Sequence, residues 1–131
     1  MTENSSKILI VDDDPMNLSI LEILLGDDYH LVKATDGEAA VAKAISEHPE
    51  LVLLDVMMPG MDGYEACRRM RSEPSLKNLR IILVSAKAMP SERLKGFEAG
   101  ADDYVTKPFD HDELCAKIRV YLGMDRKMDA A

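Results

Sequence analysis

Short apolar runs alternate five times with helix-like stretches along this chain, and no other feature limits its possible folds as strongly. Nearly continuous apolar runs are typical of strands that are covered on both faces, as in a parallel sheet. Strict alternation of strand and helix predicts an α/β fold in which helices cover both faces of that sheet. The predicted strands are residues 7–11, 30–34, 51–54, 80–84 and 103–106.

Capping residues place the helices between these strands. Asp14 followed by Pro15 is typical of a helix start, and Gly100 is typical of a helix end. Five parallel strands favour the flavodoxin-like order 2-1-3-4-5, a three-layer (βα)5 sandwich whose ligands bind beyond the carboxyl ends of the strands. The predicted helices cover approximately residues 15–26, 35–48, 64–72, 90–99 and 110–122.

Size and charge restrict the class of protein. The 131 residues suit one domain, which we expect over residues 7–122, between a polar segment at 1–6 and a frayed tail at 123–131. A net charge of −8 argues against direct nucleic-acid binding, because few cations remain to neutralise phosphates. No apolar run approaches the ~20 residues that span a bilayer, and the polar start lacks the features of a signal peptide. With two widely separated cysteines as well, we expect a cytoplasmic protein without a membrane segment.

Polar side chains follow four of the predicted strands. Asp12 and Asp13 end the first strand, Asp55 the third and Ser85 the fourth, while the fifth runs into Lys107. In the predicted strand order these ends come from neighbouring strands, so we expect the side chains to converge on one edge of the sheet.

Such a cluster needs positive charge. Two carboxylates ~5 Å apart repel by about 3 kcal/mol at an effective dielectric constant near 20. A divalent cation with oxygen ligands, such as Mg²⁺, removes this repulsion, and Lys107 adds an ammonium group. An aspartate carboxylate can accept a phosphoryl group, which a metal and a lysine stabilise during transfer. The cluster therefore favours phosphoryl transfer to an aspartate.

Each of these residues also has an ordinary structural interpretation. An aspartate after a strand usually caps a helix or lies in a solvated loop, and Ser85 alone would more often be a cap. Lys107 alone would be a solvated surface lysine. Their joint placement on one edge is what favours a functional site.

Four segments resemble response-regulator receiver domains of two-component signalling, and the resemblance covers about residues 7–122. The loop from Asp55 to Gly63 and the ending Lys107-Pro108-Phe109 are individually specific. The segments are Val11-Asp12-Asp13-Asp14-Pro15, Leu53-Leu54-Asp55-Val56-Met57-Met58-Pro59-Gly60-Met61-Asp62-Gly63, Val84-Ser85-Ala86 and Gly100-Ala101-Asp102-Asp103-Tyr104-Val105-Thr106-Lys107-Pro108-Phe109.

The resemblance implies a role for each residue of the cluster. Asp55 would be the phosphoacceptor and Lys107 the lysine that pairs with the phosphoryl group. Asp12, Asp13 and Asp55 would hold Mg²⁺, with Asp13 a more direct ligand than Asp12 and the backbone carbonyl of Met57 completing the protein ligands. The domain would catalyse only its own phosphorylation and dephosphorylation, so it would not be an enzyme in the ordinary sense.

The resemblance also implies a conformational switch and partners. Ser85 would move toward the phosphoryl group, Tyr104 would turn inward, and the peptide bond before Pro108 would be cis. The donor would be a phosphohistidine on a sensor histidine kinase or a histidine phosphotransfer protein. A downstream effector would bind the face formed by the fourth helix, fifth strand and fifth helix, and phosphorylation-dependent homodimerisation is left open.

Three other functions compete with this one. In a phosphatase of the haloacid-dehalogenase type, Asp12 would be the nucleophile, but the chain lacks the length for a cap domain and Asp55 would be unexplained. A flavodoxin-like nucleotide or flavin binder would want Gly, Ser or Thr where the first loop has acids. An interaction module that is never phosphorylated would not need the complete acidic set.

Two positions beside the predicted site bear on how long a phosphoryl group would last. Met57 lies two residues after Asp55, and Lys87 lies two residues after Ser85. Neither is suited to orienting water, so we expect slow hydrolysis, with ordinary loop residues as the alternative. The kinase, the stimulus and the output cannot be read from the sequence.

Overall fold

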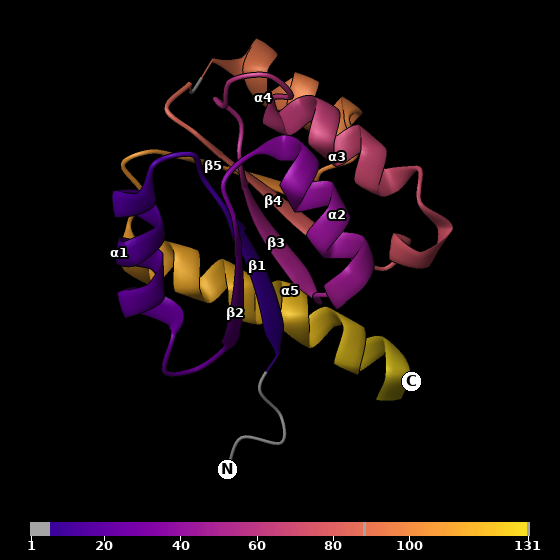
Figure 1. Ribbon diagram of the computed structural model, residues 1–131. Helices are drawn as coiled ribbons and strands as arrows, with labels where there is room; N and C mark the ends of the chain where they lie inside the picture. Colours follow the sequence, from indigo (N-terminus) through magenta and orange to yellow (C-terminus); the bar gives the residue numbers. More distant parts are fainter. Residues whose placement is uncertain (1–5, 88, 131) are drawn as a thin grey trace.

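The computed structural model describes residues 6–87 and 89–130 and contains a five-stranded parallel sheet between two layers of helices (Figure 1). The strand order is β2-β1-β3-β4-β5, which confirms the predicted flavodoxin-like topology. The strands are β1 (Lys7–Val11), β2 (His30–Ala34), β3 (Leu51–Asp55), β4 (Arg80–Ser85) and β5 (Asp103–Thr106).

The helices begin where the sequence provides caps. The side chains of Asp14, Asp36 and Asp62 each accept a hydrogen bond from a backbone N–H in the first turn of the helix that follows. A short 3₁₀ turn, η1 (Pro74–Leu76), was not predicted. The helices are α1 (Pro15–Leu25), α2 (Gly37–Glu47), α3 (Gly63–Arg71), α4 (Pro90–Glu98) and α5 (His111–Ala130).

Two apolar cores lie on the two faces of the sheet, because successive strand residues point to opposite sides. In β1, Leu9 and Val11 face the core beneath α2, α3 and α4, whereas Ile8 and Ile10 face the core beneath α1 and α5. All four side chains are at most 2% exposed. Burial on both faces explains why the strands have continuous apolar sequences rather than alternating ones.

The C-terminal helix differs from its prediction. α5 continues to Ala130, whereas the sequence suggested an end near Leu122 followed by a frayed tail. A single glycine, here Gly123, costs a helix only about 1 kcal/mol relative to alanine, and no proline follows it. The boundaries of the domain at residues 7 and 122 stay predictions, and residues 1–5 of the predicted N-terminal segment lie outside the described residues.

Within residues 6–87 and 89–130, none of the helices combines the length and apolar character that a membrane span requires. Cys67 and Cys115 are both free thiols. Burial raises the pKa of the Cys67 thiol to about 11, so this cysteine stays protonated and unreactive.

Strand register brings the functional edge together. Val11 pairs with Leu54, so the residues that follow them, Asp12 and Asp55, lie side by side at the ends of β1 and β3. On the other side of β3, Asp55 pairs with Val84, the residue before Ser85. The predicted convergence at the carboxyl edge is therefore a direct consequence of strand order.

Candidate functional site

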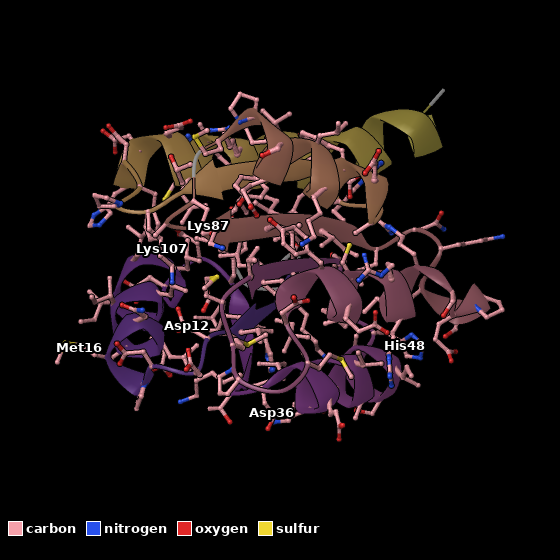
Figure 2. All side chains as sticks on the ribbon, turned by 90° about the horizontal axis from the view of Figure 1, so that it is seen from above. Asp12, Met16, Asp36, His48, Lys87 and Lys107 are labelled. Atoms are coloured by element: carbon pink, nitrogen blue, oxygen red, sulfur yellow. The ribbon has the colours of Figure 1, made fainter. Side chains whose placement is uncertain are left out.

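Three carboxylates meet at this edge of the sheet. Asp12 and Asp55 are each only 4% exposed, whereas Asp13 is exposed to solvent. One oxygen from each of the three side chains lies within 4.8 Å of the others. Figure 2 shows Asp12 and Lys107 near each other at one end of the molecule, with His48 at the opposite end.

Lys107 bridges the two buried carboxylates. Its Nζ lies 3.0 Å from Oδ2 of Asp12 and 3.2 Å from Oδ1 of Asp55. The backbone N–H of Lys107 donates to the carbonyl of Ser85 at 2.8 Å, which fixes the chain where it leaves β5. The peptide bond between Lys107 and Pro108 is cis, as the resemblance implied.

Asp12 is further oriented by the start of α1. Its Oδ1 accepts the backbone N–H of Asp14 at 3.0 Å, and its Oδ2 accepts the side-chain amide of Asn17 at 3.1 Å. Asn17 was not among the predicted site residues. Its position in the first turn of a helix that begins just beyond the acidic pair was the available signal, since that turn faces back toward the strand end.

The acidic cluster has more negative charge than its lysine neutralises. Burial, together with the neighbouring charge of Asp12, raises the pKa of Asp55 even though Lys107 opposes the shift. Burial by itself would lower the pKa of Lys107, but its contacts with Asp12 and Asp55 outweigh that effect and raise the pKa. A hard divalent cation among Asp12, Asp13 and Asp55 would offset the remaining repulsion, so the donor set fits Mg²⁺.

We predict that the domain, with divalent cations removed by a chelator, loses stability as the pH rises from about 3.8 through the raised pKa of Asp55. In that range the unfolded chain has released a proton that the folded chain still holds, so the folded state binds more protons. The stabilisation that this bound proton contributes is complete below the ordinary pKa of an aspartate and is lost above the raised pKa of Asp55.

Urea unfolding at a series of pH values would test this prediction against an Asp55→Asn variant. The variant has no proton to release at this position, so its free energy of unfolding relative to wild type should increase across the range. A constant difference between the two proteins would contradict the prediction.

Ser85 and Tyr104, the predicted switch residues, are both buried. Ser85 has no exposed surface, and its Oγ accepts the backbone N–H of Lys87 at 3.1 Å. Tyr104 is 2% exposed, with its hydroxyl 3.4 Å from that of Tyr64. The family resemblance implied that Tyr104 turns inward on phosphorylation, and in this structure its ring points into the core.

Met57 and Lys87 line one hollow between the β3–α3 loop and the start of α4. The Met57 side chain is 52% exposed, and Lys87 is exposed as well. Both positions are therefore open to solvent. Coordination of a metal by the Met57 carbonyl stays a prediction.

Comparison with known proteins decides the family. The family model described as the response regulator receiver domain matches residues 8–119. The chain belongs to the response regulator receiver domain family. This receiver domain is 41% identical over 116 residues to the response regulator PleD of Caulobacter vibrioides, covering 88% of this chain and 26% of that protein.

Solved structures agree with this assignment. A crystal structure from Chloroflexus aurantiacus J-10-fl, of a protein assigned to the response regulators, superposes with a TM-score of 0.86 at 38% identity, covering 92% of this chain and 99% of the other. The receiver domain of the sensor histidine kinase PA1611 from Pseudomonas aeruginosa PAO1 gives a TM-score of 0.84 at 32% identity, covering 91% and 98%.

The family assignment separates the competing functions. A receiver domain is a signalling module rather than a metabolic enzyme, which disfavours the phosphatase and the flavin binder. The chain spans about half or less of the length of the curated relatives it matches, such as 26% of PleD and 49% of ResD from Bacillus subtilis.

Proposed function

We propose that this receiver domain accepts a phosphoryl group on Asp55 from a phosphohistidine of a sensor histidine kinase or a histidine phosphotransfer protein. The observation that carries the proposal is the contact of Lys107 with both Asp12 and Asp55, beside a third carboxylate from Asp13. Helix capping or solvation does not explain why three acids and one lysine meet at the carboxyl edge of the sheet.

In the proposed transfer, a carboxylate oxygen of Asp55 forms a bond to phosphorus while the bond from phosphorus to the imidazole nitrogen breaks. The nitrogen keeps the electron pair, and because the other ring nitrogen of the reacting phosphohistidine carries a proton, the partner's histidine leaves as neutral imidazole. Lys107 holds Oδ1 of Asp55 at 3.2 Å, which orients the carboxylate and places an ammonium group beside the incoming phosphoryl oxygens. Asn17 keeps Asp12 in place during the step.

The proposed cofactor is Mg²⁺, held by Asp12, Asp13, Asp55 and the Met57 carbonyl. When bound, the ion neutralises charge on the carboxylates and on the phosphoryl oxygens. The Pseudomonas aeruginosa receiver domain has a magnesium ion coordinated in its active-site cleft, which supports the proposal by similarity. The pKa of Asp55 is raised mainly by burial and then by the negative charge of Asp12, and a cation beside the two carboxylates would offset both effects.

The conformational change on phosphorylation is proposed to pass through Ser85 and Tyr104 to the face formed by α4, β5 and α5. A phosphoryl group adds strong acceptors that attract the Ser85 hydroxyl, so phosphorylation favours one of two packings. α4 exposes the large apolar side chains of Leu94 and Phe97, and α5 exposes that of Val120, which suits binding of an effector or a second receiver. A homodimer formed on phosphorylation is therefore part of the proposal.

The donor is proposed to approach over α1. Met16, Ile20 and Ile23 are exposed on this helix, at 70%, 41% and 83%, and Figure 2 shows Met16 projecting outward. Ile20 also lines a hollow that reaches Asp55 and Lys107. An apolar helix face of the partner could pack here while its histidine faces Asp55. A cytoplasmic location stays a prediction from the sequence.

Intact mass spectrometry tests the proposal directly. The chain is incubated with acetyl phosphate and Mg²⁺, and a parallel sample contains excess chelator. We expect one added phosphoryl group with Mg²⁺ and little or none with chelator, while a sizing column reports any dimer. Equal labelling in both samples would contradict a metal-dependent transfer.

We predict that Lys87→Glu shortens the lifetime of the phosphorylated state. Lys87 lies two residues after Ser85, whose Oγ accepts its backbone N–H, so we expect a carboxylate at position 87 to be able to orient water that attacks the phosphoryl group on Asp55. A well-positioned general base typically accelerates a reaction by at least ~10²-fold. Because a carboxylate at position 87 would be exposed to solvent, we expect a smaller, several-fold increase in the rate of dephosphorylation. Loss of the phosphorylated mass after removal of the donor measures the decay.

Lys87→Met is the matched control, because it removes the charge without adding an acid. Its decay should remain close to that of wild type. Equal decay rates in Lys87→Glu and wild type would contradict a role for this position in hydrolysis.

A further inference from the structure

Tyr104 has a hydroxyl partner inside the core. The hydroxyl oxygens of Tyr104 and Tyr64 lie 3.4 Å apart, and Tyr64 is itself 3% exposed. The Tyr64 hydroxyl also lies 2.9 Å from Oε1 of Glu92, which can only accept from it while ionised. The backbone carbonyl of Glu92 is a second acceptor for this hydroxyl, at 3.2 Å. With its single proton directed to Glu92, Tyr64 accepts from Tyr104, which gives a chain of hydrogen bonds from Tyr104 through Tyr64 to Glu92.

α4 holds both tyrosine rings with its basic residues. The guanidinium of Arg93 lies 5.4 Å from the centre of the Tyr104 ring, and its Nη1 donates to the Tyr104 carbonyl at 3.2 Å. The ammonium of Lys95 lies 4.8 Å from the centre of the Tyr64 ring. Cations at these distances attract the faces of aromatic rings, so Arg93 stabilises the Tyr104 ring and Lys95 stabilises the Tyr64 ring.

Gly96 provides the space that the inward ring occupies. A Cβ at this position would lie 3.0 Å from Cδ2 of Tyr104 and 2.9 Å from Cδ1 of Leu83, closer than ordinary packing allows. Glycine is otherwise a poor choice in the middle of a helix. Glycine at this position of α4 therefore leaves room for the inward Tyr104 ring, independently of the hydrogen bonds.

We propose that Tyr64 is a positioning residue for Tyr104 and that, with Glu92 and Gly96, it holds the ring inward before any phosphoryl group arrives. The inference rests on the proposed function, in which Tyr104 reports the state of Asp55. One part of the switch is then already in its final position in the resting domain. Phosphorylation has only to supply the remaining difference, through Ser85 and α4.

Fluorine NMR of the full chain, labelled with 3-fluorotyrosine and free of phosphodonor, tests the proposal. Tyr104→Phe identifies the resonance of Tyr104, and its shift between H₂O and D₂O measures exposure of the ring. In wild type we expect a protected resonance. Loss of one hydrogen bond changes the ratio of exposed to inward ring positions about fivefold. Tyr64→Phe should therefore raise the exposed population of the Tyr104 ring about fivefold.

Tyr121→Phe is the matched control. It also removes a hydroxyl bound to an acid, Asp103, but its ring is partly buried against the core on the other face of the sheet from the Tyr104 ring. The bond from the Tyr104 backbone N–H to Oδ1 of Asp103 does not involve the Tyr121 hydroxyl. The Tyr104 resonance should keep its protection in this variant. Gly96→Ala is the second test, because it fills the space of the ring while leaving every hydrogen-bonding group in place, and it should increase exposure as well.

Failure of this inference and failure of the proposed function would give different results. A protected Tyr104 resonance in both Tyr64→Phe and Gly96→Ala would overturn the positioning role, even if Asp55 were phosphorylated normally. Conversely, absence of phosphorylation on Asp55 would overturn the proposed function, but the Tyr104 ring could still be protected in the chain without phosphodonor. An exposed resonance in wild type would also overturn the inference.

Discussion

Asp55→Asn is expected to fold normally and to form no acyl phosphate. Asparagine has nearly the same shape, but its neutral amide cannot act as the nucleophile that a carboxylate provides. The change also removes the buried charge that lies next to Asp12. Incubation with acetyl phosphate and Mg²⁺, followed by intact mass spectrometry, should show one added phosphoryl group in wild type and none in the variant.

Asp28→Asn is a suitable control for this prediction. Asp28 is an exposed aspartate in the connection between α1 and β2, outside the acidic cluster. Its variant should be labelled like wild type. Undiminished labelling of Asp55→Asn would contradict the assignment, and labelling that was lost only in Asp12→Asn would make Asp12 the acceptor instead.

Asp13→Asn is expected to weaken Mg²⁺ binding strongly while leaving the fold intact. Asp13 is exposed, so its removal disturbs no core packing, yet it contributes one of three oxygens within 4.8 Å. Loss of an outer-shell partner of a metal typically costs about 10- to 100-fold in affinity. Loss of a direct carboxylate ligand should cost at least as much. Isothermal titration calorimetry suits the measurement, because the chain has no tryptophan to report binding.

Asp27→Asn is the matched control, because it also removes one exposed carboxylate and leaves the cluster unchanged. Its Mg²⁺ affinity should equal that of wild type. If Asp13→Asn and Asp27→Asn bound Mg²⁺ equally well, Asp13 would not be a ligand and the cation would have to lie elsewhere.

The strand order and the edge at which the site lies could be predicted from the sequence. Continuous apolar runs mark strands buried on both faces, and five such strands alternating with helices leave few arrangements. Asp12, Asp55 and Ser85 each follow such a run, so their meeting required only the correct order. The family resemblance then supplied the expected role of each residue.

The sequence did not predict two contacts, of which one is local and the other depends on tertiary packing. Asn17 joins the site because the first turn of α1 faces Asp12, and its type alone carries no such signal. Tyr64 and Tyr104 are 40 residues apart, and their contact depends on how α4 packs through Gly96. The inward position of Tyr104 is a choice between rotamers, which apolar patterning cannot decide.

The central claim is that Asp55, and no other acid of the cluster, receives the phosphoryl group. Borohydride reduction of the phosphorylated chain converts an aspartyl phosphate to homoserine, and peptide mass mapping then locates the changed residue. We predict homoserine at position 55 in the sample containing Mg²⁺ and acetyl phosphate, and none in the sample with chelator. Homoserine at position 12 or 13, or an unchanged Asp55 in a chain that had gained a phosphoryl group, would contradict the account.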